Sequence, residues 1–186
     1  MKYEAIVIGA SSGGLNALTF LFSALPPGFS IPIIVVQHVG SRSDSQWIDL
    51  LNDKSKLHIK EADEKEKIEP GHTYIAPPNY HLLVEKDKTF SLAASERVNF
   101  ARPSIDVLFE SAAEAYKDKL IGIILTGSNA DGTAGMQKVK ACGGLAIVQD
   151  PETAESPLMP ASVIANTAID YVLPLENIIN LLLKLY

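Results

Sequence analysis

The chain has 186 residues, a formal net charge of −6, and a composition that is 47% hydrophobic and 20% charged. A chain of this length suits one compact domain with a single sizeable core, so we expect residues 1–186 to form one domain. The acidic balance argues against nucleic-acid binding, which needs clustered lysine and arginine. No apolar run approaches the roughly 20 residues of a membrane span, so no membrane insertion is expected.

The N-terminus and the single cysteine indicate the compartment. The sequence begins Met-Lys-Tyr-Glu and runs at once into an apolar segment of strand length, so no signal peptide is predicted. Cys142 cannot form an internal disulfide, which fits a reducing compartment. We therefore expect a cytoplasmic protein.

The first third of the chain alternates strands and helices. We predict a strand at Tyr3–Ile8, a helix at Leu15–Leu25 from its helical spacing of apolar residues, and a buried strand at Ile31–Gln37. A further helix follows, with Ser43 as N-cap and Gln46 three residues later, as in a capping box. This alternation predicts a mostly parallel sheet with helices on both faces.

The middle of the chain has a different pattern, with short strand-like segments separated by turn signals. Asp87-Lys88 lies between the last two segments and indicates a hairpin, so an antiparallel edge or flap is predicted here. The four segments are Leu57–Glu61, Thr73–Ala76, His81–Lys86 and Thr89–Ala93.

The alternation of strand and helix returns in the C-terminal half. Ser104 can cap a helix at Ile105–Tyr116, and Leu120–Leu125 is apolar enough for a buried strand. The predicted fold class is α/β, a doubly wound and mostly parallel sheet flanked by helices, with a short antiparallel hairpin in the middle of the chain. The remaining elements are a helix at Gly132–Ala141, a strand at Leu145–Gln149, a short helix at Pro160–Asn166, a strand at Tyr171–Leu173 and a helix at Asn177–Leu185.

Polar residues that could perform chemistry follow three of the predicted strands. Ser11 follows the first strand, His38 follows the strand that ends at Gln37, and Asp131 lies in the loop after Leu120–Leu125. The carboxyl ends of parallel strands lie along one edge of a sheet, so these residues can meet if their strands are neighbours. A serine hydroxyl needs an imidazole to take its proton, and the imidazole needs a carboxylate to orient it. The three residues are therefore a candidate catalytic triad of nucleophile, base and carboxylate.

The turn around Ser11 has a second property that suits acyl transfer. Ser11 lies in the segment Gly9–Gly14, between a strand and a helix, where small neighbours let a carbonyl group approach. The helix N-terminus supplies unpaired backbone N–H groups and a partial positive charge. These groups could stabilise the oxyanion of a tetrahedral intermediate.

Other interpretations of the same residues remain open. The Gly9–Gly14 turn is also of the kind that binds phosphate, which would make the chain a non-catalytic nucleotide- or phosphate-binding module. It lacks, however, the Gly-Lys-Ser/Thr of a Walker A motif and the spacing of Gly-x-Gly-x-x-Gly. Ser11 or Ser12 could serve only as a helix cap. Other histidines compete for the role of base, namely His58, His72 and His81.

Five segments occur in an order that is more specific than any one of them. They are Ile8–Gly14, Gln37-His38, Pro70–Pro77, Arg102–Phe109 and Leu125–Met136, the last with its Asp131-Gly132 pair. Together they resemble the catalytic domain of the chemotaxis protein-glutamate methylesterases, the CheB family, over essentially the whole chain. The resemblance implies hydrolysis of glutamyl methyl esters on methyl-accepting chemotaxis receptors, often with deamidation of receptor glutamines. It places the nucleophile on Ser11 rather than Ser12, the base on His38 and the carboxylate on Asp131.

The expected chemistry is acyl transfer, which needs neither a metal nor an organic cofactor. We expect backbone N–H groups near Ser12 and Ser128 to hold the oxyanion. Arg102 is expected either to position the receptor segment or to form a structural salt bridge. Two positions depart from the family pattern: Gly127–Ala130 lacks the usual Met and Gly-Asn before the aspartate, and Ala101 replaces a frequent His. Both departures concern substrate recognition more than catalysis.

Many family members carry a phosphorylatable receiver domain ahead of the esterase, whereas this chain begins at the first esterase strand. The resemblance therefore implies either an excised domain or a stand-alone enzyme, for which a separate regulatory receiver domain would be a partner. A regulatory esterase of the same fold that acts on a non-receptor substrate remains a further alternative.

Overall fold

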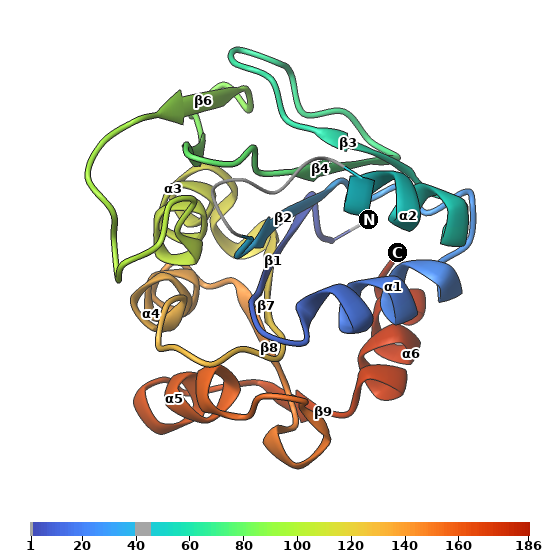
Figure 1. Cartoon of the computed structure of the whole chain (residues 1–186), viewed down its shortest axis with the longest axis vertical. Helices are drawn as coiled ribbons and strands as arrows, with labels where there is room; N and C mark the ends of the chain where they lie inside the picture. The colour runs from blue at the N-terminus through green and yellow to red at the C-terminus, as the bar shows by residue number, and fades with distance from the viewer. Residues whose placement is uncertain (1, 40–45) are drawn as a thin grey trace.

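The computed structural model describes residues 2–39 and 46–186, and this part of the chain has an α/β architecture (Figure 1). Its centre is a parallel seven-stranded sheet with the strand order β3-β4-β2-β1-β7-β8-β9. The predicted doubly wound, mostly parallel fold is confirmed. The strands of this sheet are β1 (Ala5–Ala10), β2 (Ile33–Gln37), β3 (His58–Glu61), β4 (His72–Ile75), β7 (Leu120–Ile124), β8 (Leu145–Gln149) and β9 (Tyr171–Leu173).

Helices cover both faces of the sheet (Figure 1). One face carries α1 (Gly14–Ala24), α2 (Gln46–Lys54) and α6 (Leu175–Leu185); the other carries α3 (Ile105–Tyr116), α4 (Thr133–Ala141) and α5 (Leu158–Asn166). Two short 3-10 helices, η1 (Lys117–Lys119) and η2 (Pro151–Thr153), lie in connections. In the described part of the chain, no helix is long and apolar enough to cross a membrane.

A hydrophobic cluster fills the space between the sheet and each helical layer. Along β1, Ile6 and Ile8 belong to one cluster, whereas Ala5 and Val7 belong to the other. Successive side chains of a strand point to opposite faces, so a strand covered on both sides must be apolar throughout. This is why β1, β2 and β7 appear in the sequence as continuous apolar runs.

The hairpin predicted around Asp87-Lys88 is confirmed, but it is not an edge of the main sheet. Strands β5 (His81–Val84) and β6 (Phe90–Ala93) pair antiparallel as a separate two-stranded sheet. The two preceding segments, β3 and β4, extend the parallel sheet beyond β2. β3 is the edge strand of the sheet and is partly exposed, so its sequence lacks the long apolar run of the central strands.

Some predicted helix boundaries differ from the structure. α5 begins at Leu158 rather than Pro160, because a proline is tolerated within the first turn of a helix. α6 begins at Leu175, directly after Pro174, and not at Asn177. The predicted N-cap Ser43 lies outside the described residues.

The strand order brings the ends of three strands together. β1 lies between β2 and β7, and all three are parallel. The chain leaves β1 toward β2 on one side and later returns to β7 on the other, which makes this a topological switch point of the sheet. Ligands of open α/β sheets bind in the crevice at such a point, outside the carboxyl ends of the strands.

Candidate active site

The turn after β1 is shaped by glycine. Gly13 has a φ of 78°, a left-handed conformation that residues with a side chain rarely adopt. A Cβ added to Gly14 would lie 1.9 Å from Oε1 of Gln37 and 2.9 Å from Cβ of Ala10, so a larger residue there would displace the Gln37 side chain. The Ser11 N–H donates to the carbonyl oxygen of Thr126 at 3.0 Å, which joins the turn to the loop after β7.

Gln37, the last residue of β2, holds the backbones of Ser11 and His38 together. Its Nε2 donates to the carbonyl oxygen of Ser11 at 2.9 Å and to that of His38 at 3.0 Å. Its Oε1 has no hydrogen-bond partner among the described residues and faces Gly14 at the start of α1. The partial positive charge of the helix N-terminus is favourable for this oxygen. The sequence pattern places Gln37 next to His38 but contains no signal for this role.

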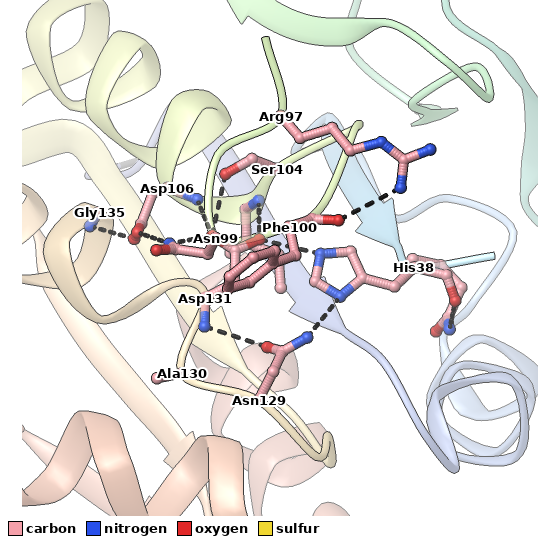
Figure 2. A network of polar contacts seen from close by, with 12 residues as sticks. His38, Arg97, Asn99, Phe100, Ser104, Asp106, Asn129, Ala130, Asp131 and Gly135 are labelled. Atoms are coloured by element: carbon pink, nitrogen blue, oxygen red, sulfur yellow. Dashed lines mark hydrogen bonds and ion pairs between the residues drawn. The ribbon is translucent and has the colours of Figure 1, made fainter. Parts of the chain in front are cut away.

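His38 is held through both ring nitrogens (Figure 2). Its Nε2 lies 2.9 Å from Oδ2 of Asp131, and its Nδ1 lies 3.1 Å from Nδ2 of Asn129. The carboxylate only accepts hydrogen bonds and the amide NH₂ only donates them, so the proton resides on Nε2 and the Nδ1 lone pair accepts. The imidazole therefore has a fixed orientation and a fixed tautomer. In this tautomer Nδ1 is the basic nitrogen.

Asp131 is fully buried against the amino end of α3. It accepts hydrogen bonds from the backbone N–H groups of Ile105 at 2.7 Å and Asp106 at 3.2 Å. Its Oδ1 also accepts from the hydroxyl of Ser104 at 2.9 Å and from the amide of Asn99 at 3.1 Å. The helix predicted after Ser104 is confirmed, but the Ser104 hydroxyl does not cap it. Instead, the carboxylate of Asp131 accepts hydrogen bonds from the first N–H groups of the helix.

The hydrogen bonds to Asp131 keep it ionised. Burial acts to raise the pKa of this carboxyl, but hydrogen bonds from His38, the Ile105 N–H and Asn99 outweigh burial, so its pKa is lowered below the usual range. An ionised carboxylate can stabilise an imidazolium that forms when His38 takes a proton.

A second buried carboxylate, Asp106, lies beside the first. It accepts hydrogen bonds from the Gly135 N–H and from Asn99, both at 2.7 Å. Burial raises the pKa of Asp106, and the nearby charge of Asp131 acts in the same direction. Asn99 thus donates to both carboxylates and connects them (Figure 2).

A cavity of about 350 Å³ opens beside this network. Ser11 and His38 both line it, but within the described part of the chain the Ser11 hydroxyl makes no hydrogen bond to the imidazole. The structure thus brings the three predicted residues to one place and joins two of them directly. The other lining residues are Val39, Arg97, Asn99, Phe100, Ala101, Arg102, Pro103 and Asn129.

The predicted oxyanion residues lie on two loops that meet. The hydroxyl oxygens of Ser12 and Ser128 are 2.8 Å apart, and the Thr126 hydroxyl donates to the carbonyl oxygen of Ser12 at 2.9 Å. Because the Ser11 N–H is already donated to Thr126, it is not free to bind an oxyanion in this conformation.

Arg102 lines the cavity, but its hydrogen bonds are to the backbone. Its Nη1 donates to the carbonyl oxygens of Ala94 at 3.0 Å and Ser95 at 2.7 Å. Among the ion pairs of the described residues none involves Arg102, so the expected structural salt bridge is absent there.

The competing histidines lie elsewhere. His81 is buried, its Nε2 donates to the carbonyl oxygen of Glu96 at 2.9 Å, and its Nδ1 accepts from the Ser104 N–H at 3.1 Å. Both of its nitrogens are therefore occupied in structural hydrogen bonds. His58 and His72 pair across β3 and β4, with their ring centroids 5.0 Å apart. In residues 2–39 and 46–186, no group of three or more metal-binding side chains is found.

A family model, curated relatives and a solved structure all relate this chain to the same protein family. The sequence model of the CheB methylesterase family matches residues 6–182. A Leptospira interrogans protein with the provisional name protein-glutamate methylesterase/protein-glutamine glutaminase is 60% identical, over 100% of this chain and 96% of that protein. A Thermotoga maritima protein-glutamate methylesterase/protein-glutamine glutaminase is 41% identical over 98% of this chain and 54% of that protein. The crystal structure of the Thermotoga maritima CheB methylesterase catalytic domain superposes with a TM-score of 0.94, 41% identity and 99% coverage of both chains. The chain belongs to the CheB methylesterase family.

Proposed function

We propose that this chain is a serine hydrolase that cleaves glutamyl methyl esters on chemotaxis receptors and deamidates receptor glutamines, with Ser11, His38 and Asp131 as its triad. The observation that carries the proposal is the position of His38. Its imidazole is hydrogen-bonded to a buried, ionised carboxylate and lines the same cavity as Ser11. The names of the relatives support the choice of substrate.

The first step is acylation of Ser11. Because Asp131 occupies Nε2 of His38, the nitrogen that takes the Ser11 proton is Nδ1. The Ser11 hydroxyl must therefore replace or share the hydrogen bond that Asn129 now donates to Nδ1. The serine oxygen then attacks the ester carbonyl carbon as its proton passes to Nδ1. Asp131 stabilises the resulting imidazolium and stays ionised.

Collapse of the tetrahedral intermediate completes acylation and is followed by hydrolysis. Backbone N–H groups near Ser12 and Ser128 hold the oxyanion, and the His38 proton leaves with methanol. Water then gives a proton to His38 and attacks the acyl-enzyme. The glutamate side chain is released, and Ser11 recovers its proton from His38. In deamidation, ammonia leaves in place of methanol.

The setting of this reaction is also part of the proposal. Residues 1–186 act as one catalytic domain in the cytoplasm. The proposal of one domain is supported by the single seven-stranded sheet, whose strands lie between Ala5 and Leu173 in the sequence. The receptor is the protein substrate, and a separate receiver domain is the proposed regulatory partner.

The phosphate-binding alternative is less well supported by the turn itself. The Ser11 N–H donates to Thr126, and the Gly14 N–H donates to the carbonyl oxygen of Ser11 at 2.8 Å. These two donors of the Gly9–Gly14 segment are therefore not free to bind a phosphate, whose capture depends on unpaired N–H groups.

The test is methanol release from a methylated receptor. Ser11→Ala and His38→Gln should each lower kcat by about 10³-fold or more. Ser12→Ala is the matched control for the nucleophile and should retain most of the activity. An active Ser11→Ala together with an inactive Ser12→Ala would overturn the assignment of Ser11.

A further inference from the structure

Phe100 combines an almost fully exposed apolar side chain with a backbone conformation that is unfavourable for a bulky residue. Its side chain is 95% exposed, whereas the next most exposed large apolar residue of the described chain, Leu158, is 56% exposed. Asn99 and Phe100 both have positive φ, 50° and 64°, in a two-residue turn closed by hydrogen bonds between Val98 and Ala101. A bulky residue such as phenylalanine is strained in this conformation, which asparagine and glycine adopt more readily.

The loop that carries Phe100 is held firmly. Asn99 donates to both buried carboxylates of the site, at 2.7 Å to Asp106 and 3.1 Å to Asp131. Arg102 and His81 bind carbonyl oxygens earlier in the same loop. The exposed ring is therefore presented from a fixed position next to the triad carboxylate.

Phe100 lies at the cavity beside the proposed nucleophile and base. It lines this cavity together with Ser11 and His38, and Figure 2 shows it on the loop that also carries Arg97. Among the described residues that line the cavity, the lysine and arginine side chains are Arg97 and Arg102, in a chain whose net charge is −6. Arg97 is exposed, and its Nη1 reaches the carbonyl oxygen of Phe100 at 3.5 Å. The mouth of the cavity thus combines an apolar ring with positive charge.

We propose that Phe100 is a specificity-determining contact for the protein substrate. Its ring packs against an apolar side chain of the acidic segment that carries the scissile ester, and Arg97 faces the carboxylates of that segment. Burial of an exposed aromatic ring in a complex is a common source of binding energy. This inference rests on the proposed function and names the chemistry of the substrate segment around the ester.

The experiment compares two substrates. One is a methylated cytoplasmic fragment of a chemotaxis receptor, and the other is N-acetylglutamate γ-methyl ester, which has no neighbouring residues. Phe100→Asn should lower kcat/KM for the receptor fragment by about 10- to 100-fold, mainly through KM. The loss on the small ester should be much smaller. Asparagine tolerates positive φ, so this variant keeps the turn and should unfold at a temperature no lower than the wild type.

Two further variants sharpen the result. Phe100→Leu keeps an apolar side chain and should retain most of the activity on the receptor fragment. Leu183→Ala removes an exposed apolar side chain from α6, in the other helical layer, and should change neither activity. Equal kcat/KM of Phe100→Asn and wild type on the receptor fragment would overturn the proposal, as would equal losses on both substrates. A wild-type protein that hydrolyses the small ester but not the receptor fragment would instead refute the proposed function.

Discussion

The two ends of the parallel sheet carry cavities of similar size but opposite character. The cavity at the carboxyl ends of the strands measures about 350 Å³, and one at the amino ends, lined by Glu4, Lys88 and Tyr116 among others, measures about 380 Å³. Glu4 forms ion pairs with Lys88 and Lys119, and these hydrogen bonds lower its pKa. The side chains of Glu4, Lys88 and Lys119 are 33%, 44% and 53% exposed, so water screens their charges.

At the carboxyl end, by contrast, the carboxylate that orients the imidazole is buried and lies at a helix N-terminus. Asp131 has no exposed surface and accepts hydrogen bonds from the first N–H groups of α3. At the same end of the sheet, the turn after β1 leads into α1. Cavity size therefore does not distinguish the two ends. The difference is that a buried carboxylate orients an imidazole at one end, whereas solvated ion pairs at the other end hold nothing reactive.

Among the changes that compare the two ends of the sheet, the largest effect is expected from Asp131→Asn. An amide at this position favours the wrong tautomer of His38 and cannot stabilise the imidazolium, so kcat should fall by about 10³- to 10⁴-fold. Methanol release from the methylated receptor measures this loss, with circular dichroism as the check on folding. A loss of less than tenfold would show that the buried carboxylate contributes little to catalysis at this end of the sheet.

A smaller fall in kcat is expected at Asn129, and its size depends on the substituent. Asn129→Ala removes the donor to Nδ1 and should lower kcat by about tenfold, since the imidazole is then held only by Asp131. Asn129→Asp places an acceptor beside Nδ1, favours a proton there and should lower kcat by about 100-fold. Nitrogen-15 NMR of His38 reports the tautomer directly. If Asn129→Asp were as active as Asn129→Ala, the assignment of Nδ1 as the base would be wrong.

The pH dependence of stability is a third test, and it concerns the buried carboxylate at the carboxyl end. The pKa of Asp131 is lower in the folded protein than its ordinary value of 3.8, so its stabilisation is present above that value and is lost as the pH falls through the folded value. At pH 7, Asp131→Asn should lower the free energy of unfolding by about 2 kcal/mol, because it disturbs the hydrogen bonds to a buried charged group. This difference should shrink below pH 4 in urea titrations. A difference that stays constant down to pH 2 would contradict the lowered pKa.

The smallest effect is expected from Glu4→Gln at the amino end. Partly exposed ion pairs contribute little, so the free energy of unfolding should fall by about 0.5 kcal/mol and hydrolysis should not change. Urea unfolding at low and high salt measures the change in the free energy of unfolding. Methanol release measures hydrolysis. A loss of activity here would mean that the amino-end cavity takes part in catalysis.

The sequence allowed the central part of the fold to be predicted well. Strands buried on both faces, such as β2 and β7, are continuous apolar runs, and the polar residues that follow them fall at one edge of a parallel sheet. Ser11, His38 and Asp131 could be chosen as candidates on this basis. The placement of β3 could not be predicted in the same way, because a short and partly exposed edge strand has no such run.

The polar residues that hold the triad could not be predicted. Gln37, Asn99 and Asn129 are amides of a kind found throughout protein surfaces, and each acquires its role from partners that are distant in the sequence. Asn99, for example, donates to Asp131, which is 32 positions away. Its positive φ is consistent with the preference of asparagine for left-handed turns, but that signal predicts a turn and not a hydrogen bond to a buried carboxylate.

The two hydrogen bonds that Gln37 donates to the backbone have a consequence for the time course of the reaction. Because one amide binds the carbonyl oxygens of both Ser11 and His38, the main chains of nucleophile and base move as a unit. For the serine hydroxyl to reach Nδ1, the Ser11 side chain must rotate and the Asn129 amide must give up or share its hydrogen bond to that nitrogen. Rotations of accessible side chains take picoseconds to nanoseconds. We therefore expect turnover of a small ester to be independent of solvent viscosity, as in an enzyme with no slow closing step.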